Sequence, residues 1–233
     1  MKKLLSIVCL SILLFSSCNK NSEDINYSCD SAVNAWAKSN RSEIHDMSRS
    51  EWLKLTENKK QATYRVFNAS EKWNFWKDKL SETLTLNWNT NEKIHIKALY
   101  DKVNENPQWF EDNFSKSEDF SEVEKFCYIW SEYAKMNLGW NKQQIGSIIM
   151  SGNQLLDTKG TLIEITDKSF KSTRLKTTTE ITETKLNCHC NRTHDFCDKY
   201  EQCTNPSNSK CNELDKGCGI LLLESCDGRC NRS

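Results

Sequence analysis

The chain has 233 residues and a balanced charge, with 32 lysines and arginines against 32 aspartates and glutamates. A nucleic-acid-binding protein needs a basic face to neutralise phosphates, so we expect no nucleic-acid partner. The chain contains only 7 glycines and 2 prolines, which favours helices over a turn-rich β-sandwich.

Residues 1–17 have the pattern of a secretory signal peptide, with two lysines, an apolar run from Leu4 to Phe15, and small residues before Cys18. The run is too short to cross a hydrocarbon core of about 30 Å as a helix. The small residues before Cys18 resemble a bacterial lipobox, which implies cleavage before Cys18 and lipid attachment to its sulfur. The alternative is a plain secretory peptide with an incidental cysteine.

Residues 18–27 are polar, lack a periodic apolar face and are typical of a flexible tether. Lys20, followed by Glu23 and Asp24, resembles the export signal of some Gram-negative surface lipoproteins. We therefore expect an exported protein of the bacterial cell envelope, anchored in a membrane through the lipid on Cys18, with surface exposure left open.

Residues 28–154 have a helical pattern almost throughout. All eight tryptophans lie between Trp36 and Trp140, so the apolar core is expected there. The clearest stripe places Trp73, Trp76, Leu80 and Leu84 on one helix face, with Ser70 as a candidate N-cap.

Local signals predict the ends of further helices. Ser48 with Glu51 and Ser121 with Glu124 match the capping box, Gly139 is a predicted C-terminal stop, and Pro107 ends another helix. The predicted inward residues are Ile96, Leu99, Tyr100 and Val103 in one helix, and Val123, Phe126, Cys127, Trp130, Tyr133, Ala134 and Leu138 in the next.

No stretch of the sequence matches a known catalytic constellation, such as a phosphate loop, a nucleophile elbow or a zinc-protease helix. His45 and His95 are isolated and are predicted to be surface or incidental residues. We expect a protein that is not an enzyme, with no catalytic residue and no cofactor.

Residues 155–186 form a threonine-rich segment without tryptophan, proline or cysteine. Weak alternation near its start is compatible with short strands or one hairpin. We predict an extended, protease-sensitive connection between the helices and the C-terminal end.

Residues 187–233 are too few to fold by apolar burial alone and require covalent or metal cross-links. Export to an oxidising compartment favours four disulfides. A direct bridge between the near neighbours Cys188 and Cys190 would strain the chain, so these two cysteines should have different partners. The sequence leaves the pairing open among 105 arrangements. The cysteines are Cys188, Cys190, Cys197, Cys203, Cys211, Cys218, Cys226 and Cys230.

Two alternatives concern other uses of the cysteines. Cys29 and Cys127 form either a further bridge or two buried thiols, and the oxidising compartment favours the bridge. Zinc is a rival to the disulfides because His189 and His194 lie among the cysteines, but the paired C-x₂-C knuckles of structural zinc sites are absent, so no metal is expected.

The order Cys-x-Cys-x₆-Cys-x₅-Cys, with Asn187 before it and Asp195-Phe196-Cys197 inside it, resembles fulvocin C, a small secreted bacteriocin. The chain as a whole resembles the bacteriocin fulvocin C-related proteins, in which a signal peptide and a helical region precede such a module. The resemblance to the fulvocin C peptide itself covers residues 187–230. The spacing between Cys226 and Cys230 departs from the fulvocin C pattern.

The predicted architecture is mainly α, a helical bundle or array followed by a small disulfide-rich C-terminal module with little regular structure. The favoured function is binding of an unknown protein or envelope partner by this module. The alternative is a bacteriocin-like toxin or its precursor, with the module released by proteolysis. Residues 186–233 carry a net charge of −1, which argues against a cationic pore former.

Overall fold

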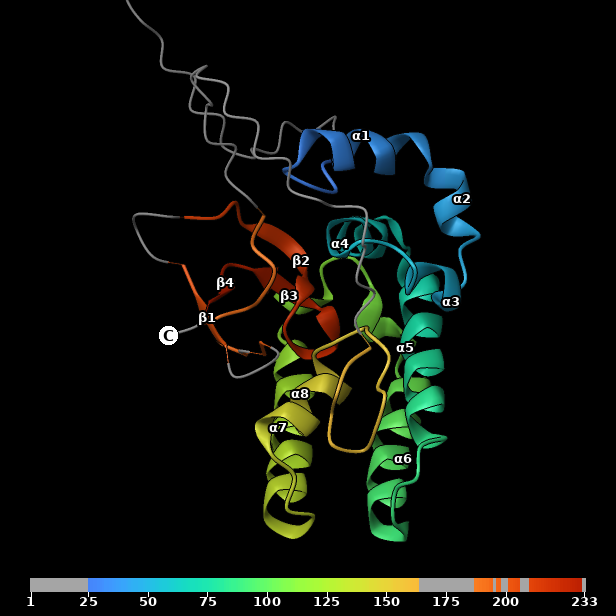
Figure 1. Ribbon diagram of the computed structural model, residues 1–233, viewed down its shortest axis with the longest axis vertical. Helices are drawn as coiled ribbons and strands as arrows, with labels where there is room; N and C mark the ends of the chain where they lie inside the picture. The colour runs from blue at the N-terminus through green and yellow to red at the C-terminus, as the bar shows by residue number, and fades with distance from the viewer. Residues whose placement is uncertain (1–24, 164–186, 195, 198–200, 206–209, 232–233) are drawn as a thin grey trace, which may run out of the picture.

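The computed structural model describes residues 25–163, 187–194, 196–197, 201–205 and 210–231 (Figure 1). These residues form a mainly α protein with a disulfide-rich C-terminal module, as predicted. The helices are α1 (Ser31–Ser39), α2 (Arg41–His45), α3 (Arg49–Trp52), α4 (Glu57–Val66), α5 (Ala69–Leu84), α6 (Thr90–Glu105), the 3₁₀ helices η1 (Pro107–Phe110) and η2 (Phe114–Lys116), α7 (Phe120–Asn137) and α8 (Lys142–Ile149).

Helix starts follow local capping chemistry. The predicted capping box of Ser48 and Glu51 is confirmed at α3. Helix α5 begins two residues earlier than predicted, because the Asn68 side chain accepts from the backbone N–H of Glu71 and the Glu71 carboxylate accepts from that of Asn68. Ser70 is therefore inside the first turn, and its prediction as the N-cap is wrong.

The predicted capping box at the start of α7 is also wrong. This helix begins at Phe120, and the side chain of Asp119 before it makes no capping hydrogen bond. The Ser121 hydroxyl instead donates to the carbonyl of Glu118 at 2.8 Å, within the turn that opens the helix. Glu124 therefore lies one turn inside α7, and its carboxylate does not cap the helix.

The helical core is built around α5, which packs beside α6 (Figure 1). On the predicted stripe, Trp76 and Leu80 are fully buried and Trp73 and Leu84 are partly buried. The Trp76 indole N–H donates to the Tyr64 hydroxyl at 3.0 Å, so its one polar atom is satisfied inside the core. The predicted inward residues of α6 and α7 also face this core, except for Tyr133, which is half exposed.

His95 is buried, so its prediction as a surface residue is wrong. Its ring stacks on that of Trp130 with centroids 4.5 Å apart, and the Trp130 indole N–H donates to the His95 carbonyl at 3.0 Å. Burial lowers the pKa of His95, which favours the neutral ring. His45 is partly exposed, with Nδ1 3.0 Å from a Glu71 carboxylate oxygen.

A short hairpin follows α8, at the start of the threonine-rich segment. Leu155 pairs with Leu162 in antiparallel orientation, and the Ile163 N–H donates to the Gln154 carbonyl at 2.9 Å. The two arms of this turn are joined by a single β-bridge, in the part of the chain where the sequence is compatible with short strands or one hairpin. Residues 164–186 lie outside the described residues, as does the signal peptide with Cys18.

Among its described residues, the cysteine-rich end contains two small antiparallel ladders and one 3₁₀ helix (Figure 1). β1 pairs with β4 and β2 pairs with β3. The elements are β1 (Gln202–Thr204), β2 (Leu214–Cys218), η4 (Ile220–Leu222), β3 (Glu224–Cys226) and β4 (Arg229–Asn231).

The module is not a separate tip at the end of the chain. Ile220, Leu221 and Leu223, from the run between β2 and β3, are buried in the same hydrophobic cluster as the tryptophans of the helical region. The Tyr64 hydroxyl donates to the Leu221 carbonyl at 3.2 Å. The one strongly apolar run of the module therefore completes the core of the helices.

Candidate functional site

Four disulfides cross-link the module, and all eight of its cysteines take part, as expected. The bridges are Cys188–Cys211, Cys190–Cys203, Cys197–Cys230 and Cys218–Cys226. Cys188 and Cys190 have different partners, which confirms the argument from strain. The loops that these bridges close span 23, 13, 33 and 8 residues.

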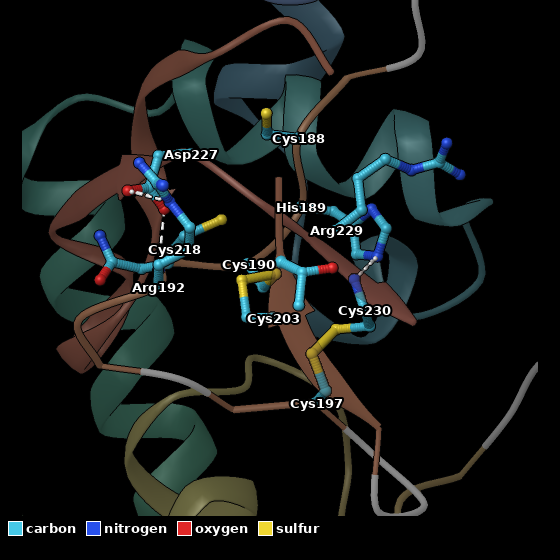
Figure 2. Close-up of a disulfide and its surroundings, with 12 residues drawn as sticks. Cys188, His189, Cys190, Arg192, Cys197, Cys203, Cys218, Asp227, Arg229 and Cys230 are labelled. Atoms are coloured by element: carbon cyan, nitrogen blue, oxygen red, sulfur yellow. Dashed lines mark hydrogen bonds and ion pairs between the residues drawn. A yellow bond between two sulfur atoms is a disulfide. The ribbon is translucent and has the colours of Figure 1, made fainter. Parts of the chain in front are cut away.

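The outer part of the module is held by two of these bridges together with β1 and β4. Cys203 lies opposite Cys230 in this ladder, and the Cys230 N–H donates to the His189 ring at 3.1 Å (Figure 2). A side chain on Gly228 would place its Cβ 2.6 Å from the Cys203 sulfur, so only glycine fits there. The sulfurs, strands and loop form one tightly packed unit.

The N-terminal segment of the described chain is attached to the module through Asn187. The Asn187 amide donates to the Ser28 hydroxyl at 2.7 Å, and its carbonyl oxygen accepts from the Cys29 N–H at 2.9 Å. Asn187 is buried, so both bonds replace contacts with water. The sequence places Asn187 at the head of the cysteine pattern, but this role appears only in the structure.

Arg65 of α4 joins three separate segments at the inner side of the module. Its guanidinium donates to the carbonyls of Lys216 at 2.9 Å and of Tyr27 at 3.2 Å, and it lies 3.6 Å from the Cys226 sulfur. Removal from water at this junction lowers the pKa of Arg65 to about 10, while Asp215 opposes that shift. Arg65 therefore fixes the module on the helices.

A shallow hollow lies at the same junction, lined by Tyr64, Lys72, Trp109, Leu223 and neighbouring residues. Lys72 is buried, and its Nζ lies 3.9 Å from Asp112. Burial lowers the pKa of Lys72 to about 8, and the nearby charge of Lys216 adds to this effect. Lys216 pairs with Asp112 at 2.6 Å, so the two lysines compete for one carboxylate.

The predicted bridge between Cys29 and Cys127 is not formed. Cys29 is disulfide-bonded, whereas Cys127 is a free thiol buried in α7. Burial raises the pKa of Cys127 to about 12, with a smaller contribution from the charge of Glu224. The bridge is excluded because Cys127 faces the helical core, whereas Cys29 packs against the cysteine cluster of the module.

A second polar group lies where the module meets α7. Glu124, His194 and Glu224 have ligand-type atoms that all lie within 4.8 Å of one another. The Nδ1 of His194 is 2.8 Å from the carboxylate oxygens of Glu224. This hydrogen bond is the main cause that raises the pKa of His194 above its ordinary value, and the charge of Glu124 acts in the same direction.

The thiols expected of a cysteine-based zinc site are consumed by disulfides. Cys190, Cys197 and Cys230 lie close together, but Cys197 is bonded to Cys230 and Cys190 to Cys203. A sulfur in a disulfide has no thiolate to offer a metal. The predicted disulfide chemistry of the module therefore prevails over the zinc alternative.

No known family model, curated protein or solved structure matches the chain. The resemblance to fulvocin C-related proteins thus stays a prediction. Four disulfides indicate an extracellular or otherwise oxidising location. Within the described residues, none of the helices combines the length and apolar character needed to cross a membrane.

Proposed function

We propose that this protein is an exported bacterial lipoprotein, anchored through Cys18, whose disulfide module binds a protein or another component of the cell envelope. The proposal rests mainly on the two-sided construction of the module. One side is fixed on the helices through Arg65 and the apolar residues around Leu221. The other side carries β1 and β4 and lies away from α5 and α6 (Figure 1).

The outer side has the properties of a presented binding surface. Its exposed residues include His189, Arg192, Thr193, Gln202 and Asn231. Arg192 is held by an ion pair with Asp227 at 3.1 Å, and this pair stands beside the disulfides (Figure 2). A cross-linked scaffold loses little conformational entropy when its loops bind a partner, which favours affinity. Such binding requires no catalytic residue and no cofactor.

The alternative of a toxin released by proteolysis has weaker support. Cleavage in residues 164–186 would free a fragment only if Ile220, Leu221 and Leu223 left the core that they share with the helices. That step exposes apolar side chains worth about 1.5–3 kcal/mol each. Immunoblots of the cell envelope and of the culture supernatant distinguish the two functions. We expect the intact chain in the envelope fraction, whereas the toxin requires a fragment of the module in the supernatant.

The binding function is tested by site-specific photo-crosslinking in the native bacterium. A photoreactive residue at Gln202 on β1 is compared with one at Lys93, an exposed position on α6. We expect one adduct of defined mass from position 202 and none from position 93. Identical adduct patterns from both positions, or no adduct from position 202, would contradict the proposal.

The anchor is tested separately by metabolic labelling with a palmitate analogue. The wild-type chain should carry the label and partition with membranes, and Cys18→Ser should abolish both. Peptide mapping of the four module disulfides serves as the control, because they should form equally in both proteins. An unlabelled wild-type chain would remove the lipoprotein part of the proposal and leave the binding part in place.

A further inference from the structure

Three potential metal ligands from three different segments converge beside α7. Glu124 lies one turn inside that helix, His194 lies in the loop after Cys190, and Glu224 opens β3. Their ligand atoms lie within 4.8 Å of one another, and all three residues are partly buried. They are 70 and 30 residues apart along the chain, so only the docking of the module on α7 brings them together.

The two ligands on the module are already held in place. One Glu224 carboxylate oxygen accepts from the Ile220 N–H at 2.8 Å. The backbone N–H of His194 donates to the Asn191 side chain at 2.9 Å, and the Asn191 amide donates to the Ser225 carbonyl at 2.9 Å. The histidine loop is thus tied to β3 directly beside Glu224. Such outer contacts orient metal ligands and lower the cost of assembling a site.

The charge of the group also suits a divalent cation. With a neutral imidazole, Glu124 and Glu224 give the group a net charge of −2. Within the part of the chain that the structure describes, neither carboxylate forms an ion pair with a lysine or an arginine. A divalent cation would neutralise this charge.

We propose that Glu124, His194 and Glu224 form a binding site for a divalent transition-metal ion of the Zn²⁺ class. An imidazole nitrogen with two carboxylates suits zinc and its neighbours, whereas Ca²⁺ and Mg²⁺ prefer oxygen ligands alone. Three protein ligands leave a fourth position for water or for an atom of a bound partner. The ion would also join the module to α7, independently of the cysteines.

The adjacent thiol makes a clear prediction about the ligand set. Cys127 follows Glu124 by one turn on the same helix, but it lies outside the group of three. Its buried thiol resists loss of the proton, which metal binding by sulfur would require. Cobalt bound in place of zinc should therefore show ligand-field absorption without a sulfur-to-metal charge-transfer band.

The test is zinc binding by the purified full chain in detergent, without a polyhistidine tag, after removal of metal with a chelator. Equilibrium dialysis followed by elemental analysis should find one tightly bound Zn²⁺ per chain. His194→Gln and Glu124→Gln should each weaken binding at least about tenfold. The matched controls are His45→Gln on α2 and Glu122→Gln, an exposed carboxylate two residues from Glu124 on α7, and both should bind zinc as the wild type does.

A second readout separates loss of the site from loss of the fold. Bound zinc should raise the midpoint of thermal unfolding of the wild type and the two controls, but not that of the two ligand variants. Far-UV circular dichroism should show the same helix content in all five proteins. A wild type that binds no more zinc than His194→Gln, a control variant that loses binding equally, or a charge-transfer band from sulfur would overturn the assignment.

Discussion

The helical region and the cysteine-rich module keep their shapes by different means. The helical region buries a continuous cluster of aromatic and aliphatic side chains, including Trp76, Leu80 and Ile96. The separate cluster of the module consists almost wholly of disulfide sulfurs and one leucine, Leu214. Cross-links make a small unit possible without a core of its own. The leucine-rich run of the module nevertheless lies in the core of the helical region. Disulfides and apolar burial therefore both stabilise the module at the junction.

Reduction of the disulfides should have the largest effect and should separate the two regions. Each bridge contributes about 2–4 kcal/mol, so the reduced module should not stay folded. Hydrogen exchange read by mass spectrometry should show lost protection at the backbone N–H groups of Cys188 and Asp227, which bond within the module. Helix α5 should keep much of its protection. Equal loss of protection in α5 and in the module would mean that the helices do not stay folded without the disulfides.

Leu221→Ala tests whether the module contributes to the helical core. Leu221 is fully buried in the shared cluster, so we expect the free energy of unfolding of the whole chain to fall by about 2–5 kcal/mol. Urea unfolding followed by tryptophan fluorescence measures this, because all eight tryptophans lie in the helical region. Met136→Ala, at an exposed position of α7, is the control and should change little. An unchanged tryptophan transition in Leu221→Ala would show that the regions fold independently.

The junction should also make stability depend on pH. The pKa of Lys72 is about 8 in the folded chain and about 10.5 when it is exposed on unfolding. Between these values Lys72 binds more protons in the unfolded chain, so its contribution to stability should increase as pH rises from about 8 to 10. Lys72→Met should flatten this slope by about 1 kcal/mol per pH unit in urea unfolding.

Lys93→Met, at an exposed position on α6, is the control for that measurement and should keep the wild-type slope. Unfolding exposes Cys127, whose thiol then ionises near a pKa of about 8.5, so all three proteins carry Cys127→Ala to prevent thiol exchange in the unfolded chain. An identical slope in Lys72→Met and the wild type would show that the Lys72 amine stays charged in the folded protein.

The smallest predicted effect compares two neighbouring residues at the start of α5. Asn68→Ala should cost about 1 kcal/mol, because it removes the hydrogen bond that caps Glu71. Ser70→Ala should change stability by less than about 0.5 kcal/mol, since Ser70 only occupies the first turn. Thermal unfolding of the two variants measures both changes. A larger loss of stability in Ser70→Ala than in Asn68→Ala would mean that Ser70 is the N-cap of α5, as the sequence predicted.

Features that depend on local sequence were predictable. The helices around Trp76 and Leu99 follow from apolar spacing, and the start of α3 follows from Ser48 and Glu51. These features require contacts between residues only three or four apart. The same local logic failed at Ser70 and Ser121, because Asn68 caps α5 and α7 begins at Phe120 without a side-chain cap.

Features that depend on distant contacts were not predictable. Lys79 lies on the apolar face of α5 because its Nζ donates to the carbonyls of Ser147 and Asn153, 68 and 74 residues later. Periodicity alone assigns any lysine to the solvent side. The disulfide pairing and the group of Glu124, His194 and Glu224 likewise depend on which segments meet after folding.

The hydrogen bonds from Asn187 to Ser28 and Cys29 attach the module to the N-terminal segment of the described chain. They therefore limit how far the module can lie from Cys18. Ser28 is about ten residues from Cys18, and an extended chain advances no more than about 3.6 Å per residue. A lipid on Cys18 would therefore keep this end of the module within about 36 Å of the bilayer surface. The anchor proposed at Cys18 would thus place molecules of the same membrane within reach of the module.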